Sequence, residues 1–122
     1  MEAKKRIGFL VTAGPYTFQN LTTMYLLAKA ALDRGYEVSA FLYMDAVIAL
    51  NNNIRSPGEH HIPTMLKELA DRGAQIVACG ECAKFRGVRR ENLPEKTQLS
   101  GIGSLAEMVE TCDRFITLGL PV

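Results

Sequence analysis

The chain has 122 residues and a formal net charge of +1, a length that suits one compact domain and excludes two domains with separate cores. Hydrophobic residues make up 48% of it and charged residues 22%, which excludes a disordered or fibrous protein. The basic residues are spread along the chain, so the charge does not demand nucleic acid as a partner. No apolar run is long enough to span a membrane, and the first residues do not form a signal peptide. We therefore expect a single cytoplasmic domain over residues 1–122, with no membrane and no nucleic acid among its direct partners.

Apolar runs and helical stripes alternate along the chain. Runs of strand length predict strands over 6–12, 37–44, 75–78 and 114–118, and apolar residues three and four apart predict helices over 21–32, 62–70 and 102–112. Glycines follow the first two helices as stop signals. Asp45 is expected to cap a short helix that ends at Leu50. From Gly80 to Ser100 the pattern is weak and indicates only a helical turn at 91–94 and a short strand at 97–99.

This alternation predicts an α/β fold, because strands that follow one another through helices form parallel sheets covered on both faces. We expect a three-layer α/β/α sandwich with a mostly parallel, doubly wound sheet of about five strands. In such sheets, ligands and reactive groups collect beyond the carboxyl ends of the strands.

Cys79 lies at such a strand end and begins the sequence Cys79-Gly80-Glu81-Cys82. Helix N-terminal amides or nearby cations would favour its thiolate, which is the reactive form of the side chain. Three chemistries use this spacing: a metal site, dithiol-disulfide exchange between the two cysteines, and persulfide transfer, for which only Cys79 is essential.

The other candidate ligands argue against a metal. Tetrahedral zinc needs four ligands, and the only histidines are the adjacent pair His60 and His61, which we assign to a loop or helix start. Cys112 falls on the apolar face formed by Ile102, Leu105, Ala106 and Val109, so we expect it to be an inert core thiol. The turn after the first strand lacks a phosphate-binding glycine pattern. We expect neither a metal nor a cofactor.

One local basic cluster follows the cysteines and comprises Arg86, Arg89 and Arg90. It is either a solvated loop or a docking patch beside Cys79. Lys84 and Arg86 are candidates for electrostatic support of the thiolate, although each is equally compatible with an ordinary surface position.

Three stretches resemble the DsrE/DsrF/DsrH-like sulfur-relay family, and in particular its DsrE and TusD type of subunit. They are the opening strand and turn from Arg6 to Tyr16, Cys79 with Arg86-Gly87-Val88, and the stretch from Leu99 to Glu107 followed by Thr111 to Arg114. Together they span nearly the whole chain, so the resemblance implies a single DsrE-like domain over residues 1–122.

The resemblance implies a subunit that forms homo- or hetero-oligomers and passes persulfide sulfur between donor and acceptor proteins, in tRNA thiolation or in sulfur oxidation. Cys79 matches the position of the sulfur-carrying cysteine, whereas Cys82 departs from the TusD-type pattern. A thiol at that position either expels sulfide by forming a disulfide or is a spectator. The leading hypothesis is a sulfur carrier that uses Cys79. The alternatives are a dithiol-disulfide redox protein that uses Cys79 and Cys82, and a non-catalytic assembly subunit, so whether the chain is an enzyme stays open.

Overall fold

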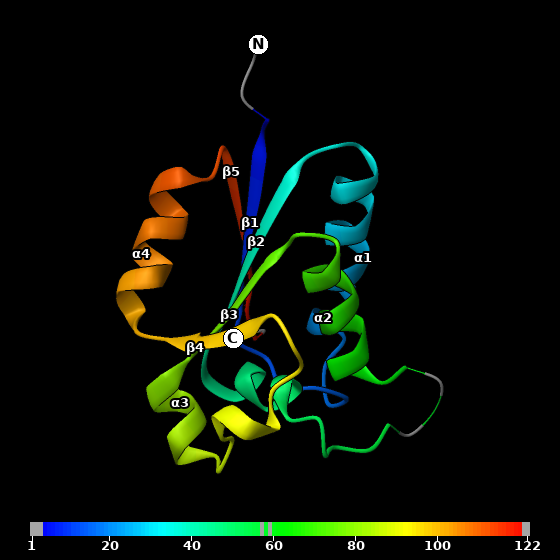
Figure 1. The fold of residues 1–122 in the computed structure, drawn as a ribbon, viewed down its shortest axis with the longest axis vertical. Coiled ribbons are helices and arrows are strands. Elements are labelled where there is room, and N and C mark those ends of the chain that lie inside the picture. Colours follow the sequence, from blue (N-terminus) through cyan, green and yellow to red (C-terminus); the bar gives the residue numbers. More distant parts are fainter. Residues whose placement is uncertain (1–3, 57, 59, 121–122) are drawn as a thin grey trace.

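The computed structural model describes residues 4–56, 58 and 60–120, and its strands form one parallel sheet (Figure 1). The strands are β1 (Arg6–Val11), β2 (Glu37–Leu42), β3 (Gln75–Cys79), β4 (Thr97–Ser100) and β5 (Arg114–Leu118). They lie in the order β4-β3-β2-β1-β5, and each neighbouring pair is parallel. The predicted sheet of about five strands is confirmed, and in the described ranges it is parallel throughout.

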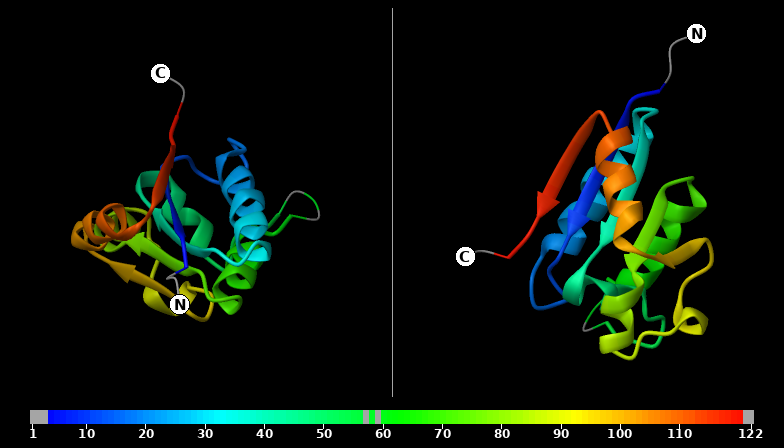
Figure 2. Two further views of the ribbon diagram at one scale, coloured as in Figure 1. Left: turned by 90° about the horizontal axis from the view of Figure 1, so that it is seen from above. Right: turned by 90° about the vertical axis from the view of Figure 1, so that its left-hand side faces the viewer.

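Helices cover both faces of this sheet (Figures 1 and 2). The α-helices are α1 (Asn20–Asp33), α2 (Ile62–Asp71), α3 (Gly80–Phe85) and α4 (Ile102–Thr111), and the 3-10 helices are η1 (Met44–Leu50) and η2 (Arg90–Asn92). Helices α1 and α2 pack against each other and against β1, β2 and β3, while α4 contacts β1 from the opposite side. The predicted three-layer architecture is therefore confirmed. Within the described residues, no helix has both the length and the apolar character needed to cross a bilayer.

The core lies between the sheet and the α1/α2 layer. Successive side chains of a strand point to opposite faces of the sheet, and in-register residues of neighbouring strands share a face. Phe9, Ala40 and Ile76 are in register across the three central strands, and each is at most 1% exposed. Leu66 and Leu69 of α2 are fully buried in the same cluster. Burial of this apolar layer fixes which face of the sheet turns toward α1 and α2.

The α4 layer is thinner than the sequence pattern predicts. Ile102 and Val109, both assigned to the inward face, are 61% and 52% exposed, and Met108 is the buried residue of the helix. Cys112 was expected in the core but is half-buried just beyond the helix end. The reason is that α4 covers only part of the sheet, so apolar residues on its outer side have no second layer above them.

Gly8 allows this part of the chain to pack closely. A Cβ atom at Gly8 would lie 2.7 Å from the Cys112 sulfur and 2.7 Å from the Phe115 ring, which no real side chain tolerates. Burial raises the pKa of the Cys112 thiol, Arg6 opposes this effect, and Asp113 adds to it. The raised pKa keeps the half-buried Cys112 as a thiol at neutral pH, where its sulfur packs close to Gly8.

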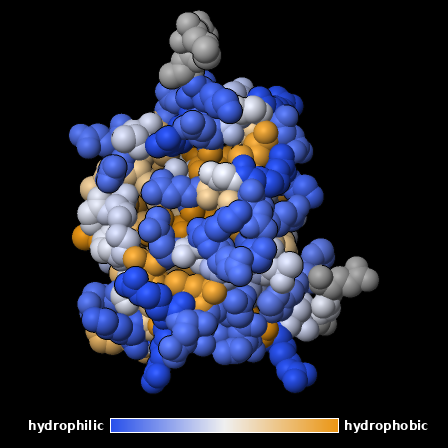
Figure 3. Space-filling view, in the orientation of Figure 1, coloured by the Kyte–Doolittle hydropathy of each residue, from blue (hydrophilic) through white to orange (hydrophobic). Residues whose placement is uncertain are grey.

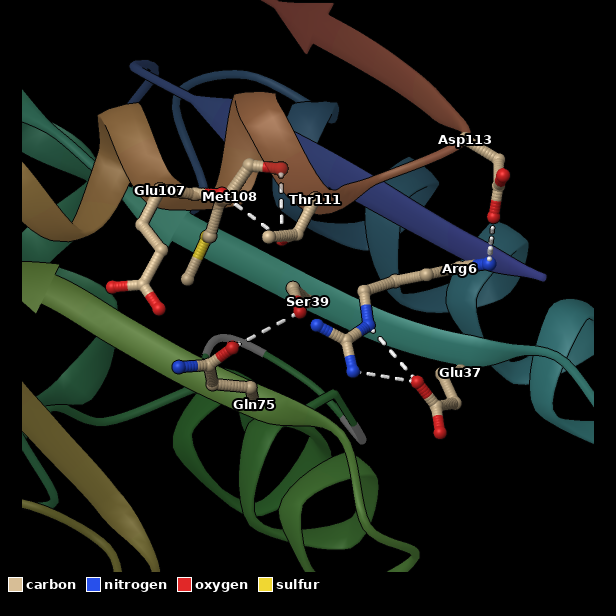
Figure 4. Close-up of polar contacts among 8 residues, drawn as sticks. All are labelled: Arg6, Glu37, Ser39, Gln75, Glu107, Met108, Thr111 and Asp113. Atoms are coloured by element: carbon tan, nitrogen blue, oxygen red, sulfur yellow. Dashed lines mark hydrogen bonds and ion pairs between the residues drawn. The ribbon is translucent and has the colours of Figure 1, made fainter. Parts of the chain in front are cut away.

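The α4 face of the sheet is polar at the amino ends of its strands (Figure 4). The buried Ser39 hydroxyl donates to the Gln75 side-chain oxygen at 3.1 Å, and Arg6 forms an ion pair with Glu37 at 2.6 Å. The backbone N–H of Arg6 donates to Asp113 at 2.8 Å, which fixes the start of β1 beside β5. These groups satisfy one another, so we regard the cluster as structural.

Candidate functional site

Cys79 is the last residue of β3, at the carboxyl edge of the sheet. Cys79 pairs in register with Ser100 of β4 and is only 7% exposed. Strand order reverses between β1 and β5, so this cysteine does not lie at the switch point where α/β sheets most often bind ligands. The site is built instead where β3 runs directly into a helix.

That helix, α3, was not predicted. The weak pattern from Gly80 onward has a physical cause, since a six-residue helix with Ala83 as its buried residue has no apolar stripe to detect. Cys79 is the N-cap of α3, and its sulfur accepts a hydrogen bond from the backbone N–H of Cys82 at 3.4 Å. The first turn of α3 therefore places a backbone N–H donor on the Cys79 sulfur.

Cys82 lies half-buried against η1. Its sulfur accepts a hydrogen bond from the backbone N–H of Met44 at 3.3 Å, and Met44 has a left-handed φ of 55° that non-glycine residues seldom adopt. Burial raises the pKa of the Cys82 thiol, and a hydrogen bond with the Cys79 side chain raises it further. The Met44 amide and Arg86 act in the opposite direction but do not outweigh burial. At neutral pH, Cys82 is thus held as a neutral thiol beside Cys79.

An ion pair joins η1 to the end of α3, the helix that carries Cys82. The Arg86 Nε donates to the Asp45 carboxylate at 2.8 Å, and its Nη1 donates to the backbone carbonyl of Cys82 at 3.1 Å. The expectation that Asp45 caps the short helix is wrong, because Tyr43 is the N-cap of η1 and makes no side-chain hydrogen bond there. Asp45 instead binds η1 to the end of α3.

The remaining predicted site residues fall in different places. Lys84 pairs with Glu81 at 3.4 Å on α3, and both side chains are over 70% exposed. His61 is the N-cap of α2, and its ring nitrogens lie 2.7 Å from the Thr64 hydroxyl and 3.0 Å from the Ile54 carbonyl oxygen. We therefore assign His61 a structural role at the helix start. Nowhere in the described part of the chain do three potential metal-ligating side chains come together.

Met44 and Asp45 are the residues of the site that sequence reasoning missed. The signal available was positional, since both follow β2, and parallel neighbours bring their carboxyl ends to the same edge. An acid after one strand and an arginine shortly after the next are candidates for an ion pair across that edge. The amide contact of Met44 has no sequence signal, because it depends on an unusual backbone conformation.

Sequence comparison connects this geometry to known proteins. The model of the DsrE/DsrF-like family matches residues 5–118. DsrE of Allochromatium vinosum is 32% identical, and the match covers 93% of this chain and 98% of that protein. Sulfurtransferase TusD of Proteus mirabilis is 31% identical, with 88% and 93% covered, and the uncharacterized protein MK0008 of Methanopyrus kandleri is also 31% identical, with 90% and 91% covered.

Solved structures share the fold at lower identity. YchN of Escherichia coli superimposes with a TM-score of 0.86 at 22% identity, covering 93% of this chain and 99% of YchN. MTH1491 of Methanobacterium thermoautotrophicum gives 0.75 at 14% identity and covers 93% and 99%. The family model, the relatives and the shared architecture agree, and the chain belongs to the DsrE/DsrF-like family.

Proposed function

We propose that this protein is a sulfur carrier that accepts sulfane sulfur on Cys79 and passes it to an acceptor thiol. Relatives named sulfurtransferase support a general role in sulfur relay. The observation that carries the finer proposal is the position of Cys79, whose sulfur caps α3 at a strand end and receives the Cys82 amide. We expect the relay to operate in the cytoplasm, where thiols stay reduced.

The transfer proceeds by two exchanges between thiolates and persulfides. The Cys79 thiolate attacks the outer sulfur of a donor persulfide, a new S–S bond forms on Cys79, and the donor leaves as a thiolate. An acceptor thiolate then attacks the outer sulfur of the Cys79 persulfide and restores the Cys79 thiolate. Each step exchanges one S–S bond for another, so no external oxidant or reductant is consumed.

Cys82 provides a second candidate function, favoured by its place one helical turn from Cys79. Its thiolate would attack the inner sulfur of the Cys79 persulfide, form a Cys79–Cys82 disulfide and release hydrosulfide. A dithiol reductant would then be needed to reopen the disulfide. Burial raises the pKa of Cys82, which makes its thiolate scarce at neutral pH and favours the carrier over the dithiol mechanism.

Exposed apolar residues support the proposal that the protein works as a homo- or hetero-oligomer with its sulfur donor and acceptor as further partners. Ile102 and Val109 lie uncovered on α4, and Ile116 and Leu120 are exposed on and just beyond β5, an edge strand of the sheet. Figure 3 shows apolar surface between hydrophilic groups on the face seen in Figure 1, where α4 lies on the left and β5 lies behind the other strands. Such surfaces commonly pack against another subunit. An assembly subunit without sulfur chemistry would use the same face but would not need a reactive Cys79.

Mass spectrometry after incubation with a persulfide donor tests the carrier proposal. The reduced protein should gain about 32 Da, the mass of one sulfur atom, and Cys79→Ser should abolish the gain. Cys112→Ser is the matched control, since it removes a half-buried thiol outside the site and should leave the gain intact.

Equal loading of Cys79→Ser and the parent protein would show that Cys79 is not the carrier. A redox couple that disappears in Cys82→Ser, with no sulfur loaded on any variant, would favour the dithiol function. A folded protein in which a thiol reagent cannot label Cys79 would favour the assembly role.

A further inference from the structure

A pocket of about 610 Å³ opens beside the cysteines, at the carboxyl ends of β3 and β4. One wall is formed by α3 and the loop that follows it, and the other by the end of β4 and the start of α4. We call this the basic pocket; its lining includes Gly80, Lys84, Arg89, Arg90, Leu99 and Ser100. Gly80 directly follows Cys79, and Ser100 is the register partner of Cys79. A molecule seated in the basic pocket therefore lies next to the segment that carries the proposed reactive sulfur.

The basic pocket carries more positive than negative charge. Lys84, Arg89 and Arg90 are exposed on its lining, where Glu81 is the acidic residue. Lys84 lies 3.4 Å from Glu81 with both side chains over 70% exposed, and Arg89 lies 3.8 Å from Glu91 in a similar setting. Exposed pairs of this kind contribute little, so a ligand carboxylate can replace them at small cost. In the described ranges, Arg90 forms no ion pair.

An exposed aromatic residue, which does not itself line the pocket, ends the helix that forms one of its walls. Phe85, the last residue of α3, is 83% exposed, the highest value among the exposed large hydrophobic residues. It lies between Lys84 and Arg86 in the chain. Aromatic and arginine side chains are enriched where protein partners dock, whereas a small inorganic anion would make no use of the ring.

We propose that the basic pocket and Phe85 form the docking site for an acidic segment of the thiol protein that exchanges sulfur with Cys79. This inference rests on the proposed carrier function and names the chemistry of its partner. Carboxylates of the segment would meet Lys84, Arg89 and Arg90, and an apolar side chain would cover Phe85. Docking would raise the local concentration of the partner's thiol beside a cysteine that is itself almost buried. Three cations and a net charge of +1 suit a short acidic peptide better than a nucleic acid, which needs an extended basic surface.

Fluorescence anisotropy measures the docking independently of sulfur chemistry. The acidic probe is a labelled peptide of alternating glutamate and leucine residues that also contains one serine. The neutral probe is the same peptide with glutamine at every glutamate position. We expect the acidic probe to bind at least about fivefold more tightly at low salt, and about 0.5 M NaCl to remove most of that difference. The triple variant Lys84→Gln, Arg89→Gln, Arg90→Gln should lose the preference, and Phe85→Ala should weaken binding of the acidic probe.

The matched control removes three exposed charges from the other end of the molecule. The control variant is Lys4→Gln, Lys5→Gln, Arg34→Gln, and it has the same net charge as the pocket variant. Its three positions precede β1 and β2, so they lie at the amino edge of the sheet. This variant should keep the full preference for the acidic probe. Equal loss in both triple variants would show a general charge effect and overturn the proposed docking site.

Two further results separate the docking site from the carrier function. Normal persulfide loading of Cys79 with equal binding of both peptides would overturn the docking site and leave the carrier function standing. Selective binding of the acidic peptide without any loading of Cys79 would overturn the carrier function and leave the docking site standing. A uridine oligonucleotide that binds through Lys84, Arg89 and Arg90 more tightly than the acidic peptide would overturn the inference in favour of RNA.

Discussion

At the scale of single residues, the proposed carrier function depends on the protonation state of Cys82. Cys82 lies close enough for its backbone N–H to contact the Cys79 sulfur, and its own sulfur is held by the Met44 amide. Burial raises its pKa, so the thiolate that would expel hydrosulfide is a minor species near neutral pH. Under the proposed function, a neutral Cys82 would let a persulfide on Cys79 persist until an acceptor arrives.

Hydrosulfide release from the loaded protein should therefore increase with pH. Below the raised pKa of Cys82, the thiolate fraction and the release rate grow about tenfold per pH unit, so the loss should be slow near pH 7 and fast near pH 9. Release can be followed with a hydrosulfide-sensitive dye on protein freed of excess donor. Cys82→Ser should abolish the pH-dependent phase, and Cys112→Ser should retain it. A release rate that is the same across this pH range in the parent protein would contradict the assigned role of Cys82.

At the scale of elements, the site is assembled where three segments meet. Strand β3 delivers Cys79, α3 places Cys82, and η1 supplies Met44 and Asp45. The Asp45–Arg86 pair holds η1 to α3, and its arginine is the less exposed partner, at 26% against 62%. Because Asp45 faces solvent, this pair is expected to matter more for the local arrangement than for global stability.

Asp45→Asn should lower the free energy of unfolding by at most about 1 kcal/mol but increase access to Cys82. In a protein where Cys79 and Cys112 are replaced by serine, the labelling rate of Cys82 by a thiol reagent should increase severalfold, because η1 opens more often. Urea denaturation of the same variant measures global stability. Lys84→Gln is the control, since it breaks a more exposed ion pair whose two residues both belong to α3. Unchanged labelling in Asp45→Asn would show that the ion pair does not hold the elements together.

The elements differ in how far the sequence could predict them. Strands and long helices show clear apolar runs or stripes, and the strand that carries Cys79 was placed correctly because its residues are buried on both faces. Helix α3 was missed because only Ala83 is buried on it. For α4 the wrong face was predicted to be buried, because the exposed side of the helix carries the apolar residues Ile102 and Val109. The Met44 contact joins residues 38 positions apart and depends on local backbone strain. Local periodicity contains none of this information.

At the scale of the whole molecule, the two faces of the sheet are covered unequally. Helices α1 and α2 bury one face, whereas α4 lies over the other in the described part of the chain (Figure 2). Ile102 and Val109 of α4 are exposed to solvent. Strand β5 is an edge strand that carries the exposed Ile116, and within the described residues its outer side has no strand to pair with. A second subunit that covers α4 and β5 would bury the exposed apolar residues and shield the open edge of the sheet. The basic pocket also includes Gly101, at the start of α4, so assembly would take place next to the proposed docking site.

Charges introduced on α4 should therefore convert an oligomer into a monomer. We expect the purified protein to elute above the mass of 13.4 kDa in size-exclusion chromatography with light scattering, and Ile102→Glu, Val109→Glu to elute at the monomer mass. Both side chains are exposed in the single chain, so the substitutions should cost little folding stability, which circular dichroism can verify. Leu26→Glu, Leu27→Glu is the matched control, because it places the same charges at exposed apolar positions on α1 in the opposite layer. Dissociation by the control and not by the α4 variant would move the interface to the other face of the sheet. A parent protein that is already monomeric would show that the α4 face does not join copies of this chain, and a sister subunit would then be the partner to test on it.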